Sequence, residues 1–223
     1  KTMVETYFKK KINKKNYLVF NFSYSKNRKL KSEFNKLVDD NYLKNTKWIF
    51  RKRSFAKGII NNNNLNWSKG SIFFQSKKIN KYAGGIKRKF PNMSTKLKKY
   101  VKEIIDEYFL RSKIITKGMY FGVHAIRIVC NKKNKGFPVP EGFHTDGVDR
   151  VAIIPVAKKF SNGGISYLKN AKNSKIVFRG KLENKILFFN DRKLLHYATP
   201  ISLTSGNLGY RDILVFTFLK KNA

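Results

Sequence analysis

Residues 119–130 read MYFGVHAIRIVC, an apolar run of strand length that carries only two basic side chains, His124 and Arg127. Short apolar runs with turn residues between them are typical of a β-sandwich or barrel, whereas α/β folds alternate strands with long helices. The chain after residue 118 therefore predicts a domain of the α+β class that is mainly β. The further predicted strands are Arg150–Val156, Gly164–Leu168, Ile176–Phe178, Lys185–Phe189 and Asp212–Leu219.

Upstream of this run the pattern changes to helical spacing. Ser94 is a suitable N-cap, and residues 95–111 then place apolar side chains on one face, which predicts an amphipathic helix packed on a core. A helix followed by a series of strands indicates a β core with helices on one face. We predict one domain over residues 1–223, with residues 1–93 as an N-terminal extension and lid, and residues 94–223 as the helix and β core. Earlier predicted elements are a helix at Arg28–Asp40, strands at Tyr17–Phe22, Trp48–Phe55 and Ser71–Gln75, and an exposed turn at Asn61–Asn64.

The charge of the chain is extreme, with 49 Lys+Arg residues against 13 Asp+Glu and a formal net charge of +36. Such a charge can serve a polyanion partner such as nucleic acid, or it can reflect compositional drift in an AT-rich genome. Lysine outnumbers arginine about fourfold. Because folded proteins recruit arginine to bind phosphates and bases, we favour drift. Weak, salt-dependent and non-specific polyanion binding is expected in either case.

The chain contains a single cysteine, Cys130, so a disulfide within the chain is excluded and a reducing compartment is expected. Cys130 ends an apolar run, which indicates a buried thiol rather than a nucleophile. No apolar stretch reaches the roughly 18 residues that a membrane span needs, and the first residues show no secretory signal. We expect a cytoplasmic protein without membrane contact.

The segment with the most chemical content is residues 140–149, PEGFHTDGVD. His144 and Asp146 are two residues apart, so in extended backbone both side chains point to one face and can bind one metal ion. A His-x-Asp pair alone is weak evidence. About fifty residues later His196 follows an apolar strand, where a hydrogen-bonded core histidine is the ordinary explanation. Together the three residues predict a catalytic metal site of the 2-His-1-carboxylate type, with coordination positions left open.

The segments EGFHTDGVD and LLHYATPI, followed by Arg211 fifteen residues after His196, resemble the superfamily of 2-oxoglutarate- and Fe(II)-dependent oxygenases. More narrowly, they are similar to the bacterial family that includes the free L-isoleucine hydroxylases, and the similarity covers about residues 119–219. The resemblance implies a double-stranded β-helix core, also called a jelly roll or cupin barrel, buttressed by N-terminal helices. It also implies that the predicted triad binds Fe(II), that Arg211 binds the distal carboxylate of 2-oxoglutarate, and that O₂ is a co-substrate.

The reaction implied by the resemblance is hydroxylation of an unactivated C–H bond of a small substrate, a free L-amino acid, with succinate and CO₂ as co-products. Two alternatives stay open. One is an oxygenase that acts on nucleic acid or on a protein, which the charge would suit. The other is a non-catalytic, basic nucleic-acid-binding cupin module. The intact triad together with Arg211 speaks against the second alternative, because such a module is expected to lose at least one ligand.

Four further residues are candidates for the pocket. Arg127 can bind the substrate carboxylate or the C1 carboxylate of 2-oxoglutarate, or it can form a structural ion pair. His124 lies three residues away on the same predicted strand, so only one of the two can point inward. Glu141 and Asp149 can bind a substrate ammonium group or pair with lysines. Thr199, close to His196, is expected to line the cofactor pocket.

Overall fold

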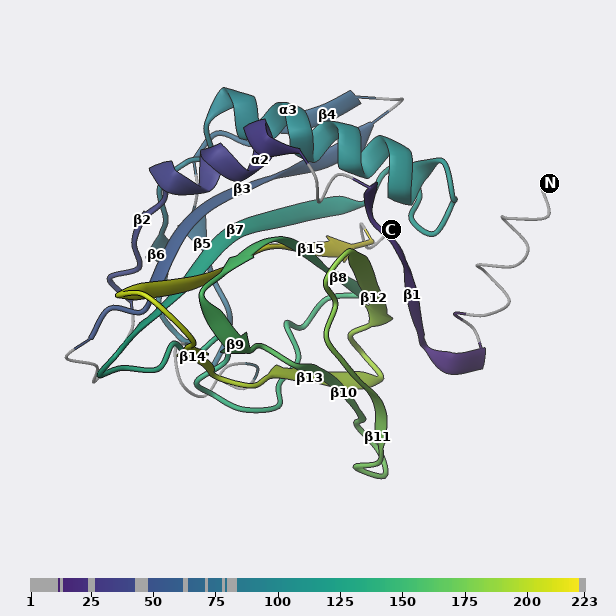
Figure 1. Cartoon of the computed structure of the whole chain (residues 1–223). Helices are drawn as coiled ribbons and strands as arrows, with labels where there is room; N and C mark the ends of the chain where they lie inside the picture. Colours follow the sequence, from purple (N-terminus) through teal and green to yellow (C-terminus); the bar gives the residue numbers. More distant parts are fainter. Residues whose placement is uncertain are drawn as a thin grey trace.

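An antiparallel sheet of eight strands forms the centre of the molecule (Figure 1), and the strands follow the order β1-β12-β8-β15-β7-β3-β2, with β4 paired to β3. The computed structural model describes residues 12, 14–23, 27–42, 48–61, 64–70, 72–77, 79 and 84–220. The long central strands carry apolar residues on both faces, since both faces are covered. The strands are β1 Tyr17–Asn21, β2 Val38–Asp39, β3 Arg51–Asn61, β4 Asn64–Trp67, β7 Tyr120–Asn131, β8 Arg150–Lys159, β12 Lys185–Asn190 and β15 Leu208–Leu219.

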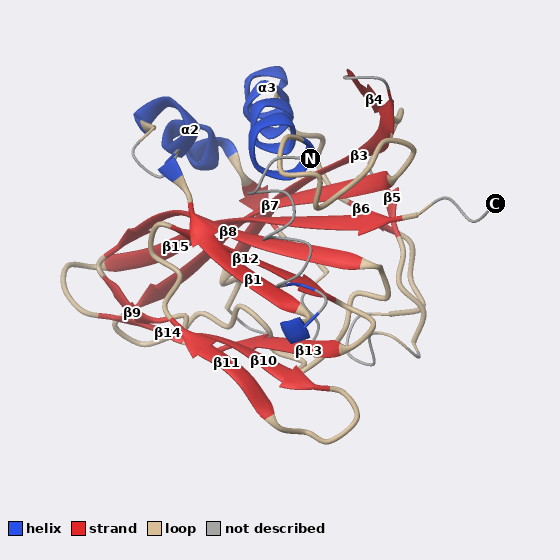
Figure 2. Cartoon of the chain, turned by 90° about the vertical axis from the view of Figure 1, so that its right-hand side faces the viewer, coloured by secondary structure: helices blue, strands red, loops and turns tan. Residues whose placement is uncertain are grey.

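A smaller layer of strands faces one side of this sheet (Figure 2). It consists of a three-stranded sheet in the order β11-β10-β13 and a two-stranded sheet of β14 and β9. Leu168 and Leu194 of this layer pack with Ile153 and Leu187 of the large sheet. Two packed layers of antiparallel strands make a jelly roll, the predicted double-stranded β-helix. The strands of the smaller layer are β9 Ser161–Gly163, β10 Ser166–Asn170, β11 Ile176–Gly180, β13 Leu194–Ala198 and β14 Ile201–Leu203.

Two helices cover the other side of the large sheet (Figure 1). Helix α3, Thr95–Ile104, continues as a π-helical turn through Leu110, and the Ser94 hydroxyl caps it by accepting the Leu97 N–H at 3.1 Å. Its buried face joins the same core cluster as the sheet. The predicted amphipathic helix is thereby confirmed.

The predicted helix at Arg28–Asp40 is too long. Helix α2 spans Arg28–Glu33, and a 3-10 turn follows at Phe34–Lys36. The chain then pairs as β2 with β3, because the Asp40 carboxylate accepts a hydrogen bond from the Arg51 guanidinium at 2.7 Å and ties this segment to the sheet edge. The helix therefore ends earlier than its apolar spacing indicates, and the segment after it pairs with the sheet edge.

Strand β7 shows how the sheet separates core from cavity. Val123 and Ala125 belong to the cluster beneath the helices, whereas His124 and Ile126 line a cavity between the two strand layers. The period of two along a strand produces this division. It also decides that His124 points inward and Arg127 outward.

The remaining predicted elements differ from the structure in detail. The strand expected at Trp48–Phe55 begins at Arg51 and runs on to Asn61. The strand expected at Ser71–Gln75 corresponds to β5, Ile72–Phe73, which pairs with β6, Arg88–Lys89; Ser71 lies outside the described residues.

Three other expectations concern the Asn tract, Cys130 and membrane spans. The expected turn at Asn61–Asn64 lies between β3 and β4, with Asn62 and Asn63 outside the described residues. Cys130 is a buried free thiol, as predicted. Within the described part of the chain, no helix has the length and apolar character of a membrane span.

Candidate metal centre

The loop that carries the His-x-Asp pair lies directly against β13. The backbone N–H of His144 donates to the carbonyl of His196 at 3.2 Å, and the N–H of His196 donates back at 2.8 Å. This isolated bridge brings both rings to one place, with centroids 4.1 Å apart. Asp146 completes the group, and the potential ligand atoms of all three residues lie within 4.8 Å of one another. Backbone pairing therefore brings His144 and His196 together although they lie about fifty residues apart in the sequence.

The ring nitrogens are oriented for one shared ion. The Nε2 atoms of His144 and His196 lie 3.9 and 3.8 Å from opposite oxygens of the Asp146 carboxylate. The His144 Nδ1 lies 3.1 Å from the Gly142 carbonyl oxygen, which can only accept, so this nitrogen carries the proton. The His144 Nε2 faces the carboxylate and is the nitrogen that can offer its lone pair to a metal ion. This donor set fits a ferrous ion with open coordination positions.

Asp191 supports the site from behind, and sequence reasoning missed it. Its fully buried carboxylate accepts the backbone N–H groups of Asp146, Gly147 and Val148 at 2.8 to 3.1 Å. The same carboxylate lies 3.8 Å from His196 Nδ1, an atom with no hydrogen-bond partner among the described residues. A carboxylate behind a ligating histidine orients the ring and strengthens it as a ligand. The available signal was an acidic residue directly after a buried strand in a very basic chain.

The electrostatics of the triad follow from its burial. Burial, and to a lesser extent His144, lowers the pKa of His196 well below its usual range, so the ring is neutral and can bind a metal. Burial and the adjacent Asp146 carboxylate raise the pKa of Asp191 to about 7. A bound divalent cation would offset that repulsion, because it supplies the missing positive charge. Gln75 donates a hydrogen bond from Nε2 to Asp146 Oδ1 at 3.1 Å and so also holds the carboxylate.

The triad opens into a cavity between the two strand layers, and Arg211 reaches into this cavity from β15. Arg211 is 6% exposed, and burial lowers its pKa to about 10. Among the described residues it forms no ion pair. Gly164, at φ +67°, leaves room for it, since a Cβ atom there would lie 2.7 Å from Arg211 Cδ. The Ser166 hydroxyl, also lining the cavity, is buried and has no hydrogen-bond partner in the described part of the chain.

The other predicted pocket residues divide. Glu141 lines the cavity, with Oε1 3.8 Å from His144 Nε2. Arg127 does not: its guanidinium forms two hydrogen bonds of 2.7 Å to the Asp212 carboxylate on the helical side of the sheet. The predicted binding role of Arg127 is therefore corrected: of the two alternatives, the structure shows the ion pair, with Asp212 as the partner. The reason is strand alternation, which gives the cavity face to His124.

Thr199 and Asp149 also lie outside the set of cavity-lining residues. The Thr199 hydroxyl accepts the Ile165 N–H at 3.0 Å and so ties two strands of the smaller layer. Asp149 accepts hydrogen bonds from the Arg192 guanidinium at 2.6 Å and from the Lys220 N–H at 2.7 Å. Both predicted binding roles are corrected to structural ones. Three arginines that no sequence motif indicated line the cavity instead: Arg51, Arg53 and Arg88.

Comparison with known proteins identifies the class that this geometry defines. The model of the family described as 2OG-Fe dioxygenase matches residues 31–217, and the chain belongs to this family. It is therefore a 2-oxoglutarate-dependent dioxygenase that uses Fe(II) and 2-oxoglutarate, as its sequence motifs predicted. The three residues that would hold the iron are those that the fold brings together.

Among individual relatives, the L-isoleucine-4-hydroxylase of Bacillus thuringiensis is 25% identical over 186 residues, which are 77% of this chain and 75% of that protein. The crystal structure of a bsmA homologue from Methylobium petroleophilum PM1 superposes with a TM-score of 0.81 at 21% identity, over 97% of this chain and 93% of that one. The structure of IDO from Bacillus thuringiensis gives 0.77 at 20% identity, over 100% and 97%. The structural likenesses support the fold.

Proposed function

We propose that the protein hydroxylates an unactivated C–H bond of a free L-amino acid and releases succinate and CO₂. The observation that carries this proposal is the composition of the cavity beside the triad. Glu141 supplies a carboxylate for an ammonium group, and arginines of β3 and β6 supply positive charge. Apolar side chains such as Ile153 and Val215 lie between them. A zwitterion with an aliphatic side chain matches such a lining, and the relative named L-isoleucine-4-hydroxylase supports the same class.

Each residue of the site has a distinct part in this proposal. His144, Asp146 and His196 hold Fe(II), which together with 2-oxoglutarate supplies the oxygen chemistry when bound. Arg211 binds the distal carboxylate of 2-oxoglutarate, because a buried guanidinium without a carboxylate partner among the described residues is a strong site for one. The cavity lies between the two strand layers, and its buried charged groups interact more strongly there than they would in water.

The test is succinate release from 2-oxoglutarate by the Fe(II)-loaded protein in air, measured with each of the twenty L-amino acids. We expect one or a few aliphatic amino acids to stimulate release, and the product to gain one oxygen atom by mass spectrometry. His196→Ala is the inactive control. Parallel reactions receive DNA, RNA or a protein mixture. Stimulation by a macromolecule and by no amino acid would refute the proposal and favour the oxygenase of a macromolecule.

A further inference from the structure

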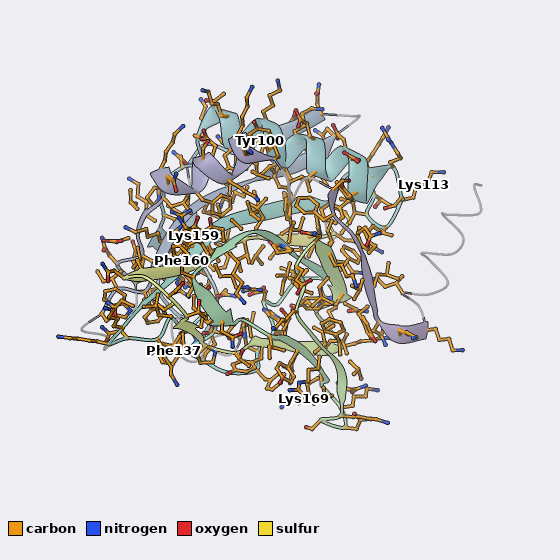
Figure 3. The ribbon with its side chains drawn as sticks, viewed as in Figure 1. Tyr100, Lys113, Phe137, Lys159, Phe160 and Lys169 are labelled. Atoms are coloured by element: carbon orange, nitrogen blue, oxygen red, sulfur yellow. The ribbon has the colours of Figure 1, made fainter. Side chains whose placement is uncertain are left out.

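A cluster of three arginines forms the wall of the cavity nearest the sheet edge. Arg51 and Arg53 lie two residues apart on β3, so they share a face, and Arg88 joins them from β6. Their exposed fractions are 5%, 7% and 3%. Most of the positive charge of this protein is carried by lysines such as Lys113 and Lys159, which are exposed, and Figure 3 shows Lys113 at the rim of the molecule. Buried guanidinium groups therefore call for a different explanation from the general excess of charge.

Asp40 is the carboxylate that pairs with this cluster, through two of its three arginines. Arg51 Nε donates to Asp40 Oδ2 at 2.7 Å, and Arg53 Nε lies 3.4 Å from the same oxygen. Arg88 instead donates to the neutral amide of Gln75 at 2.9 Å. Burial and the repulsion of Arg51 lower the pKa of Arg53 to about 9. Glu141 also attracts Arg53 and Arg88, and Asp146 attracts Arg88, but both carboxylates lie beside His144.

The cluster keeps unused hydrogen-bond donors. The Nε atoms of Arg53 and Arg88 are both buried and have no hydrogen-bond partner among the residues that the structure describes. The Arg53 guanidinium lies over the Phe90 ring at 4.7 Å, and that of Arg88 lies over the Phe73 ring at 4.9 Å. Stacking on aromatic rings holds these planar groups in place before any ligand arrives. Arg53 Nε lies 3.4 Å from Asp40 without forming a hydrogen bond, and Arg88 Nε has no partner among the described residues. Preorganised guanidinium groups with donors left over in this way are a site for an oxoanion.

The neighbours of the cluster agree with an anionic ligand. His124 is stacked on Phe55 at 4.3 Å and lines the same cavity. Burial, and then Arg53 and Arg88, lowers the pKa of His124 well below its usual range, so it adds no further charge. The Gln75 side chain connects Arg88 to the iron ligand Asp146. An anion on the arginines would thus lie within the length of a small molecule from the metal.

We propose that Arg53, paired with Asp40, and Arg88, held by Gln75, form an anion subsite that binds the carboxylate of the primary substrate and turns the rest of that molecule toward the iron. This rests on the proposed function for the identity of the substrate as an amino acid. The proposal gives arginines of β3 and β6 the binding of the substrate carboxylate, which the sequence had suggested for Arg127. Arg211 lies on a different strand, so the two carboxylic acids of the reaction have separate arginines.

The first experiment removes the carboxylate from the substrate. Each L-amino acid is compared with its C-terminal amide and with its N-acetyl derivative in the succinate assay. We expect every stimulating amino acid to lose at least about tenfold in kcat/KM as the amide, because a charge-assisted pair with a buried arginine is lost. An amide that works as well as its acid would overturn the proposal. The N-acetyl series separately reports on the ammonium group near Glu141.

The second experiment changes the protein. Arg53→Gln and Arg88→Gln should raise the KM for the amino acid about tenfold or more, with much smaller changes in the KM for the co-substrate. Both variants should fold, since each removes one of three repelling charges, and thermal melts check this. Arg53→Lys should recover part of the loss. Arg28→Gln, an exposed arginine at the start of α2, is the matched control for net charge. A rise confined to the KM for the co-substrate would assign the cluster to 2-oxoglutarate and refute the proposal.

A third experiment does not depend on knowing the substrate. Crystals of the protein are soaked in a low concentration of selenate, and anomalous scattering locates the selenium. We expect a peak between Arg53 and Arg88 that is absent in Arg53→Gln. If this peak appears although no amino acid stimulates turnover, the anion subsite stands and the amino-acid substrate is refuted. Selenate at exposed lysines only, as an adventitious ion, would overturn the subsite.

Discussion

His196 lies on a buried strand where its ring meets three different neighbours. Its Nε2 faces the Asp146 carboxylate at 3.8 Å, its Nδ1 faces Asp191 at 3.8 Å, and the His144 ring packs beside it. A histidine that served only the core would have both nitrogens satisfied by ordinary hydrogen bonds. The arrangement instead leaves one nitrogen for a metal and the other for a supporting carboxylate.

At this scale the first prediction concerns the iron ligands. His144→Ala and His196→Ala should each lose Fe(II) binding by at least about a hundredfold, because two remaining protein ligands hold the ion poorly. Anaerobic calorimetry measures the affinity. His124→Gln is the control, since this buried histidine lines the cavity but lies outside the triad, and its Fe(II) affinity should stay close to wild type. An unchanged affinity in either alanine variant would contradict the assignment.

A second prediction concerns Gly164. Gly164→Ala forces a side chain into φ +67° and places a Cβ atom 2.7 Å from Arg211 Cδ. We expect a loss of about 1 to 3 kcal/mol in the free energy of unfolding and weaker binding of 2-oxoglutarate, seen as a higher KM. Gly206→Ala has a similar φ of +70° but meets nothing closer than 3.6 Å, so it separates backbone strain from displacement of Arg211. Equal KM values in the two variants would show that Arg211 does not depend on the glycine.

At the scale of elements, the metal loop is held by a turn from another part of the chain. Asp191 lies between β12 and β13 and accepts three successive backbone N–H groups of the loop that carries Asp146. Gly147, at φ +78°, packs against Ile79, where any Cβ would come within 2.4 Å. The loop thus keeps its shape through contacts with segments before and after it in the sequence.

The third prediction follows from this turn. Asp191→Asn replaces one acceptor oxygen by a donor that faces backbone N–H groups, so we expect about 1 to 3 kcal/mol of destabilisation and an Fe(II) affinity about ten- to a hundredfold weaker. Denaturant unfolding and calorimetry measure the two effects. Asp149→Asn is the matched control. The Asp149 carboxylate, like that of Asp191, accepts a backbone N–H group, but from Lys220, and its other partner is the Arg192 guanidinium. If Asp191→Asn bound iron as tightly as the wild type, Asp191 would not support the metal site.

At the scale of the whole molecule, the charge of +36 and the buried cavity act independently. Exposed lysines attract any polyanion. Binding releases counterions from the polyanion, and this release is less favourable at high salt, so the affinity falls as the salt concentration rises. The cavity lies between the two strand layers, and no lysine of the described residues lines it.

The fourth prediction is that DNA binds weakly at low salt and dissociates by about 0.5 M NaCl, while succinate release with a small substrate is unaffected by added DNA. Fluorescence anisotropy and the succinate assay measure the two quantities on the same samples. A polyanion that remains bound at high salt and stimulates turnover would instead connect the surface charge to catalysis.

Local pattern was sufficient for some parts of this protein. The signals that were sufficient act within a few residues. They are the strand and helix periodicities of 2 and 3.6, the Ser94 cap, and the two-residue spacing of His144 and Asp146. They predicted a β-sandwich or barrel, helix α3 and a metal-binding pair, while the double-stranded β-helix and the iron came from the resemblance to the oxygenase superfamily. The choice between His124 and Arg127 needed only the knowledge of which face of β7 is covered, and this knowledge came from the structure.

Tertiary structure alone decided how the site is completed. Asp191 meets the metal loop, and Arg88 meets Arg53, across long stretches of chain, and no spacing rule links such residues. The same holds for Asp40, which pairs with Arg51 at the sheet edge although the spacing of its own segment predicted a helix. The sequence by itself indicated the three candidate ligands of the iron, because short motifs carry that information. The structure determined the surroundings of those ligands, since burial and long-range pairing set the charges there.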